Sequence, residues 1–160
     1  MIGNKIKLNL GKGFRLKKEG TFNLDKLLKE VMALAKKRKY LVQIKDHTDK
    51  SEKAGHDIII VWTLEKNINE YIKYESKIEF LLRRINKTES NVAGSNQITF
   101  TADLITDYNS KLKHTKFLKV FGEIYNTFII RNKIEKHKKK LLAELTELRD
   151  LAKLNIDMHT

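Results

Sequence analysis

Hydrophobic and polar residues alternate along much of the first two thirds of the chain, which is the period of a strand with one buried face. The clearest case is residues 70–85, EYIKYESKIEFLLRRI, where Ile72, Tyr74, Ile78 and Phe80 share one face. Lysine, glutamate and arginine occupy the opposite face. A sheet with one dry and one wet face is typical of antiparallel strands, so we expect an antiparallel sheet.

The same pattern places the other strands and the turns between them. In chain order, strands are expected at residues 5–10, 14–18, 40–45, 56–65, 70–85 and 97–108. The glycines of GKG, at 11–13, predict a turn after which 14–18 returns as a second strand. The polar runs at 46–57 and 86–96 predict loops.

Apolar residues at spacings of three and four predict helices in two regions. Asn23 is a typical N-cap for a helix over 24–39, which ends in the basic run KKRK. From Thr115 the period is helical again: we expect one helix over 116–131, a break or bend at Asn132, and a second helix over 133–154. The inner face of that last helix is expected to carry Ile134, Leu141, Leu145, Leu148 and Ala152.

These elements predict an α+β fold in a single domain spanning residues 1–160. We expect an antiparallel sheet of about five or six strands, with an N-proximal helix and a C-terminal helical pair packed on one face. No internal repeat or interdomain linker interrupts the pattern. Hydrophobic residues make up 41% of the chain, a globular composition that supplies such a core.

Composition removes several classes of function. The absence of cysteine excludes disulfides, thiolate catalysis and cysteine-based zinc sites. No apolar run approaches the roughly 20 residues that a membrane-spanning helix needs. The first residues, MIGNKIKLNLGKGFRLKK, lack the apolar centre of a signal peptide, so we expect a cytoplasmic protein.

The net charge of +13 is the strongest global feature, and it is uneven. Residues 1–50 carry a net +9, residues 51–110 a net −2, and residues 111–160 a net +6. Basic ends of this kind favour a polyanionic partner, either nucleic acid or an anionic membrane surface. A proteome with a bias toward lysine would produce the same charge without any partner.

The densest cluster is RNKIEKHKKK at 131–140. On a helix, Lys133, Lys136 and Lys140 form an outward stripe with Lys139 beside it, while His137 and Lys138 border the apolar face. Glu135 is expected to pair with Lys139, and Lys140 with Glu144, each at i, i+4. The candidate nucleic-acid-binding residues are Lys36, Lys37, Arg38, Lys39, Lys111, Lys113, Lys116, Lys133, Lys136, Lys139 and Lys140.

No pattern predicts catalysis, a cofactor or a metal site. The GKGFRL segment lacks the Gly-Lys-Ser/Thr of a phosphate-binding loop, and no HExxH is present. His47 and His56 flank acidic residues in the 46–57 run, but its lysines compete with a cation. Glu75 and Glu79 are expected to form cross-strand ion pairs. Among the aromatic residues, only Tyr71 is expected to be both exposed and close to positive charge.

Three segments, GTFNLDKLLKEVMALAKKRKY, VWTLEKNINEYIKYESKIEF and FLKVFGEIYNTFIIRNKIEKHKKKLLAEL, resemble an uncharacterised family of small α+β proteins from archaea. The resemblance covers most of the chain and is one of order and spacing. It departs at 108–112, where YNSKL stands in place of the family's Tyr-Glu-Gly-Lys-Trp. It implies an archaeal origin and no known activity.

The function expected first is non-enzymatic binding to nucleic-acid backbone without sequence specificity, in a free or ribonucleoprotein-associated form. An almost purely lysine cluster positions a protein on phosphates and does not read bases. Two alternatives stay open. One is binding of an apolar small molecule or lipid between the sheet and the helix at 115–130, as in helix-grip folds. The other is a structural subunit that uses an exposed apolar patch with Leu112, Leu151 and Leu154.

Overall fold

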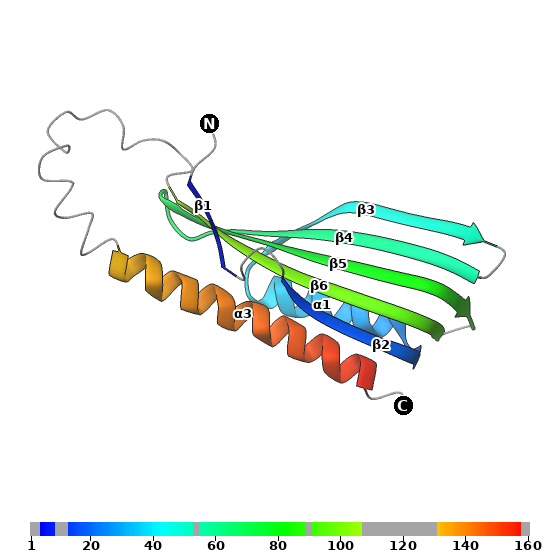
Figure 1. The fold of residues 1–160 in the computed structure, drawn as a ribbon. Coiled ribbons are helices and arrows are strands. Elements are labelled where there is room, and N and C mark those ends of the chain that lie inside the picture. The colour runs from blue at the N-terminus through cyan, green and yellow to red at the C-terminus, as the bar shows by residue number, and fades with distance from the viewer. Residues whose placement is uncertain (1–3, 9–12, 53–54, 89–90, 107–130, 158–160) are drawn as a thin grey trace, which may run out of the picture.

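A computed structural model describes residues 4–8, 13–52, 55–88, 91–106 and 131–157 of the chain. Its elements, in chain order, are β1 (Asn4–Lys7), β2 (Phe14–Phe22), α1 (Leu24–Lys37), β3 (Leu41–Glu52), β4 (Gly55–Asn67), β5 (Ile72–Lys87), β6 (Val92–Thr106) and α3 (Arg131–Asp157). The strands form one antiparallel sheet, and both helices pack against it (Figure 1). The α+β architecture expected from the sequence is confirmed.

The sheet has the order β1-β6-β5-β4-β3, with β2 also paired to β6. The predicted hairpin between residues 5–10 and 14–18 is therefore wrong, because β1 and β2 do not pair with each other. They lie end to end along β6, with Ile6 opposite Leu104 and Leu16 opposite Ile98. The 15 residues of β6 are long enough to pair with both.

A glycine is required where the chain rejoins β6. Gly13 has φ +72, and a Cβ atom there would lie 2.7 Å from the carbonyl oxygen of Phe100. Both the left-handed backbone and the close approach exclude a larger side chain. Gly13 therefore serves a return to the same edge of the sheet as β1, and not the reversal that the glycines suggest.

Two predicted loops are largely strand instead. In the run at 46–57, residues 46–52 belong to β3 and residues 55–57 to β4, with Asp49 facing Ile58 and Lys50 facing Asp57. Likewise β5 and β6 extend into 86–96 and pair Lys87 with Val92. Exposed strand positions tolerate polar side chains, so polarity alone did not distinguish strand from loop at these ends.

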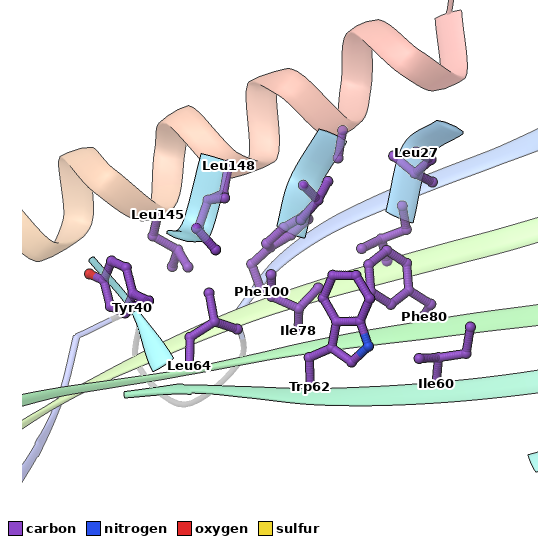
Figure 2. Close-up of a cluster of buried hydrophobic side chains, with 14 of the residues drawn as sticks. Leu27, Tyr40, Ile60, Trp62, Leu64, Ile78, Phe80, Phe100, Leu145 and Leu148 are labelled. Atoms are coloured by element: carbon purple, nitrogen blue, oxygen red, sulfur yellow. The ribbon is translucent and has the colours of Figure 1, made fainter. Parts of the chain in front are cut away.

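The core lies between one face of the sheet and the two helices. Trp62, Ile78 and Phe100 point from neighbouring strands toward Leu145 of α3 and Leu27 of α1 (Figure 2). The aromatic rings of Trp62 and Phe80 meet edge to face at 5.2 Å. The predicted inner positions of β4, β5 and β6 are buried, which confirms the alternation.

The helices start and pack largely as their sequences predict. The side chain of Asn23 caps α1 by accepting a hydrogen bond from the backbone N–H of Lys26 at 2.8 Å. In α3, Leu141, Leu145, Leu148 and Ala152 are buried as expected. Asn132 does not interrupt α3, which begins at Arg131 and includes it. The helix predicted over 116–131 lies, except for its last residue, outside the described residues.

The opposite face of the sheet is polar and partly neutralised by ion pairs. Glu75 accepts from Lys5 of β1 at 2.9 Å, which is the expected cross-strand pairing. Glu79 instead pairs with Lys77 of its own strand at 3.0 Å. Both carboxylates therefore form ion pairs, one across strands as predicted and one within its own strand.

Candidate functional site

The lysines of the predicted stripe on α3 lie in solvent. Lys133, Lys136, Lys139 and Lys140 are all exposed, and none forms an ion pair with any residue that the structure describes. The two acidic residues expected to neutralise them have other partners. Glu135 pairs with Lys138, at i, i+3 and 2.6 Å, instead of Lys139.

Glu144 turns into the core instead of toward Lys140. It is only 8% exposed and accepts a hydrogen bond from the Tyr40 hydroxyl at 2.6 Å. Both of its oxygens also accept from the Lys66 ammonium, at 3.1 and 3.2 Å. A buried carboxylate needs such partners, and it gains them from residues far away in the sequence. Lys140 consequently has no ion-pair partner among the residues that the structure describes.

The Lys66 ammonium is enclosed by aromatic rings as well as by Glu144. It lies 5.0 Å from the ring centre of Tyr40 and 5.9 Å from that of Tyr74, distances typical of cation–π contacts. Burial, and then the hydrogen bond to Glu144, raise the pKa of Tyr40, so its hydroxyl stays protonated and donates. The sequence offers one signal for this cluster: Glu144 stands at an inner position between Leu141 and Leu145.

An ion pair joins the end of α1 to the same helix. The Arg38 guanidinium donates from Nε and Nη2 to the two carboxylate oxygens of Glu147, both at 2.8 Å. This guanidinium holds the pKa of Glu147 below its usual range. The helices run antiparallel, with Asn155 donating to Glu30 at the other end of the contact. The ion pair therefore holds the basic run at 36–39 next to Glu147 of α3.

The position of Glu147 brings the two basic clusters together. Lys133, Lys136 and Lys140 lie within about 40° of Glu147 around the helix axis, and Lys140 precedes it by about 10 Å. The lysines therefore lie on the face of α3 that contacts α1 at Glu147. The first turns of α3 extend beyond the end of α1, so α1 does not cover them there. We call Lys37, Lys39, Lys133, Lys136, Lys139 and Lys140 the two-helix basic surface. Lys36 lies about 160° from Arg38 around α1 and so points away from α3.

Two groups of predicted residues stand apart from this surface. Arg38 is held by Glu147, so the exposed charge at the end of α1 comes from its three lysine neighbours. Lys111, Lys113 and Lys116 lie outside the described residues. Lys39 adopts a left-handed backbone, φ 64, where the chain leaves α1 for β3.

His137 borders the basic surface but adds no charge to it. Its Nδ1 lies 2.7 Å from the hydroxyl of Tyr74, and the two rings meet at 5.8 Å. Burial lowers the pKa of His137, and the nearby Lys140 lowers it further, so the ring is neutral near pH 7. Burial also raises the pKa of Tyr74 to about 12, which keeps that hydroxyl protonated near pH 7. Sequence reasoning missed this contact between β5 and α3.

Three other features considered from the sequence are a metal site, a membrane-spanning helix and an apolar patch. His56 lies 3.3 Å from Asp49, yet no group of three or more potential metal ligands forms among the described residues. No described helix combines the length and the apolar character needed to cross a membrane. Of the predicted apolar patch, Leu151 and the exposed Leu154 line a groove with Leu34 between the helices, and Leu112 lies outside the described residues.

Comparison with known proteins gives no further information on function. No family model, curated protein or solved structure matches the chain. The arrangement of the side chains must therefore carry any functional argument.

Proposed function

We propose that this protein binds the phosphate backbone of nucleic acids, without sequence specificity, through the two-helix basic surface. The observation that supports the proposal is the Arg38–Glu147 ion pair, which joins the end of α1, where basic residues cluster, to the helix that carries the lysine stripe. Two clusters that are about a hundred residues apart in the chain become one surface. The inward turn of Glu144 leaves that surface without its expected acidic partner.

Lysine side chains are suited to contacting phosphates and are poorly suited to recognising a base sequence. Its ammonium is a mobile point charge that contacts phosphate oxygens, whereas base edges are read by the planar groups of arginine, asparagine and glutamine. The six residues of the surface are all lysine. Binding of this kind positions a protein on the backbone and carries no sequence information. The proposal contains no catalytic step.

Salt dependence tests the proposal directly. Fluorescence anisotropy would measure binding of a labelled single-stranded RNA and a labelled duplex DNA from about 50 to about 200 mM salt. We expect log K to fall linearly with log salt, because each neutralised phosphate releases counterions. The Lys133→Glu, Lys136→Glu, Lys140→Glu triple variant should bind far more weakly, and the slope should fall by about one unit for each phosphate that the variant no longer neutralises.

A matched control separates this surface from net charge. The Lys7→Glu, Lys50→Glu, Lys153→Glu variant changes the net charge equally at exposed positions on β1, β3 and another face of α3. It should retain most of the affinity. The proposal fails if the two triple variants bind alike, or if parent binding survives about 0.5 M salt undiminished. It also fails if only vesicles containing phosphatidylserine, and neither nucleic acid, bind the parent protein.

A further inference from the structure

A pocket of about 420 Å³ lies beside the first two turns of α3, next to the two-helix basic surface. One wall comes from the turn between β4 and β5, and the other from α3. Its wall is almost entirely carbon, and its volume falls within the roughly 300–1,000 Å³ of small-ligand sites. The residues that define it are Asn69, Glu70 and Tyr71 on the turn and Lys133, Ile134 and His137 on the helix.

The turn that carries Tyr71 and the ring of His137 are held in place before any ligand arrives. The side-chain oxygen of Asn69 accepts from the backbone N–H groups of Tyr71 and Ile72, at 2.9 and 2.7 Å, which fixes the turn that carries Tyr71. On the helix side, the Tyr74 hydroxyl fixes the ring of His137. Such preorganisation reduces the conformational entropy that a ligand would otherwise have to offset.

Lys133 belongs to both the pocket and the basic surface. A chain of phosphates on that surface would therefore pass the mouth of the pocket. A nucleobase presents two apolar faces and a polar edge, and an aromatic side chain binds the face of any base. The carbon wall suits a base face, because the polar groups of the lining residues contribute almost nothing to its surface.

We propose that the pocket accepts one unstacked nucleobase of single-stranded RNA or DNA, stacked on Tyr71, with neighbouring phosphates on Lys133 and the rest of the two-helix basic surface. This inference rests on the proposed function and adds a preference for single strands, because duplex bases are not free to enter. Sequence-tolerant stacking is compatible with a surface made only of lysine.

The test compares three ligands of equal length, each with the same fluorescent label. They are a single-stranded DNA, the same strand with all bases replaced by abasic units, and the duplex. The parent protein should bind the single strand more tightly than the abasic strand by roughly 5- to 150-fold, the contribution of stacking one base. Tyr71→Ala should remove that advantage and leave binding to the abasic strand and the duplex unchanged.

Conservative variants separate stacking from folding. Tyr71→Phe keeps the ring and should bind the single strand within about twofold of the parent, since the ring face supplies the attraction. Tyr71→Leu keeps apolar volume without a ring and should behave like Tyr71→Ala. Far-UV circular dichroism and urea midpoints would verify that each variant is folded, and Tyr71→Leu serves if Tyr71→Ala is not.

The outcomes distinguish this inference from the function on which it rests. If no strand or duplex binds at low salt, the proposed function itself fails. If all three ligands bind the parent and Tyr71→Ala alike, backbone binding stands and the base pocket is wrong. The pocket assignment is also overturned if a fluorescent fatty acid binds the parent, does not bind Tyr71→Ala, and is not displaced by the single strand.

Discussion

The two halves of α3 share one continuous helix and differ in almost every other respect. In residues 131–140 no side chain is fully buried, and only Ile134, His137 and Lys138 are half-buried. In residues 141–157 one face is buried against the sheet throughout, and it includes Leu145 and Leu148 (Figures 1 and 2). The second half is therefore anchored in the core, whereas the first half lies along its margin.

The treatment of charge follows the same division. In the second half, Glu144 and Glu147 each contact a cation from another element, Lys66 and Arg38 respectively. In the first half, the exposed lysines have no such partner among the described residues. The acidic residues of the anchored half thus pair with cations of other elements. Among the described residues, none pairs with the lysine stripe of the first half. An unpaired cluster next to a well-anchored segment is what a binding surface requires, because its charge remains available to a ligand.

The largest effect is expected from removing the buried carboxylate of Glu144, which tests whether it anchors the second half of α3. Glu144→Ala leaves the Lys66 ammonium and the Tyr40 hydroxyl without their partner, and should reduce the free energy of unfolding by about 3–5 kcal/mol. Urea denaturation would measure the loss. The triple variant Tyr40→Phe, Lys66→Met, Glu144→Leu removes every member of the cluster and should recover most of it. A single variant as stable as the parent would mean that Glu144 does not anchor the helix.

A pair of core truncations compares the halves directly. Leu145→Ala opens a cavity beneath the second half and should lower the free energy of unfolding by about 2–5 kcal/mol. Ile134→Ala, in the half-buried first half, should lower it by only about 1 kcal/mol. Both losses would be read from urea midpoints at constant m-value. Equal losses would show that the two halves are equally anchored.

The smallest expected effect concerns His137, which marks the boundary between the halves. Its pKa is lowered in the folded protein, so the unfolded chain takes up a proton first as pH falls below about 6.5. The protein should therefore lose stability through this group between about pH 6.5 and the lower folded pKa, and lose none above that window. Lys140 on the same helix and the protonated Tyr74 hydroxyl on β5 face the ring.

The His137→Gln variant isolates this contribution, since the other histidines and the carboxylates titrate in both proteins. Urea denaturation at about pH 7.5 and about pH 5.5 should show a smaller loss for the variant than for the parent. If the parent and the variant lose stability equally over this range, the ring of His137 is as exposed as the lysines around it. The boundary between the exposed and the anchored half of α3 would then lie after His137.

The sequence predicted the orientation of side chains better than it predicted their partners. The inner positions of β5, from Ile72 to Phe80, follow from alternation alone, and Asn23 follows from the preference of asparagine for helix N-caps. The partner of β1 did not follow. The glycines of GKG fit a hairpin as well as they fit a return to β6, and only the close approach of Gly13 to Phe100 separates the two.

The candidate site shows the same limit. Its lysines and their outward direction were predictable, because charge and helical period are local properties of the chain. Glu144 was predicted to pair with Lys140 at i, i+4, yet a buried carboxylate gains more from Lys66 and Tyr40 than from an exposed neighbour. The joining of α1 to α3 through Arg38 and Glu147 also depends on a contact that no local pattern contains.

The sequence by itself therefore determined which residues of β4, β5 and β6 face the core, where α1 and α3 lie and where positive charge accumulates. Only the tertiary structure decided which charges are neutralised, that Arg38 joins the end of α1 to α3, and that Tyr71 and His137 line one pocket. The physical reason is that side-chain direction depends on residues three or four positions away, whereas pairing depends on contacts between distant segments. Many segments of this chain present equivalent apolar stripes and lysines, and the packing of the whole core selects among them.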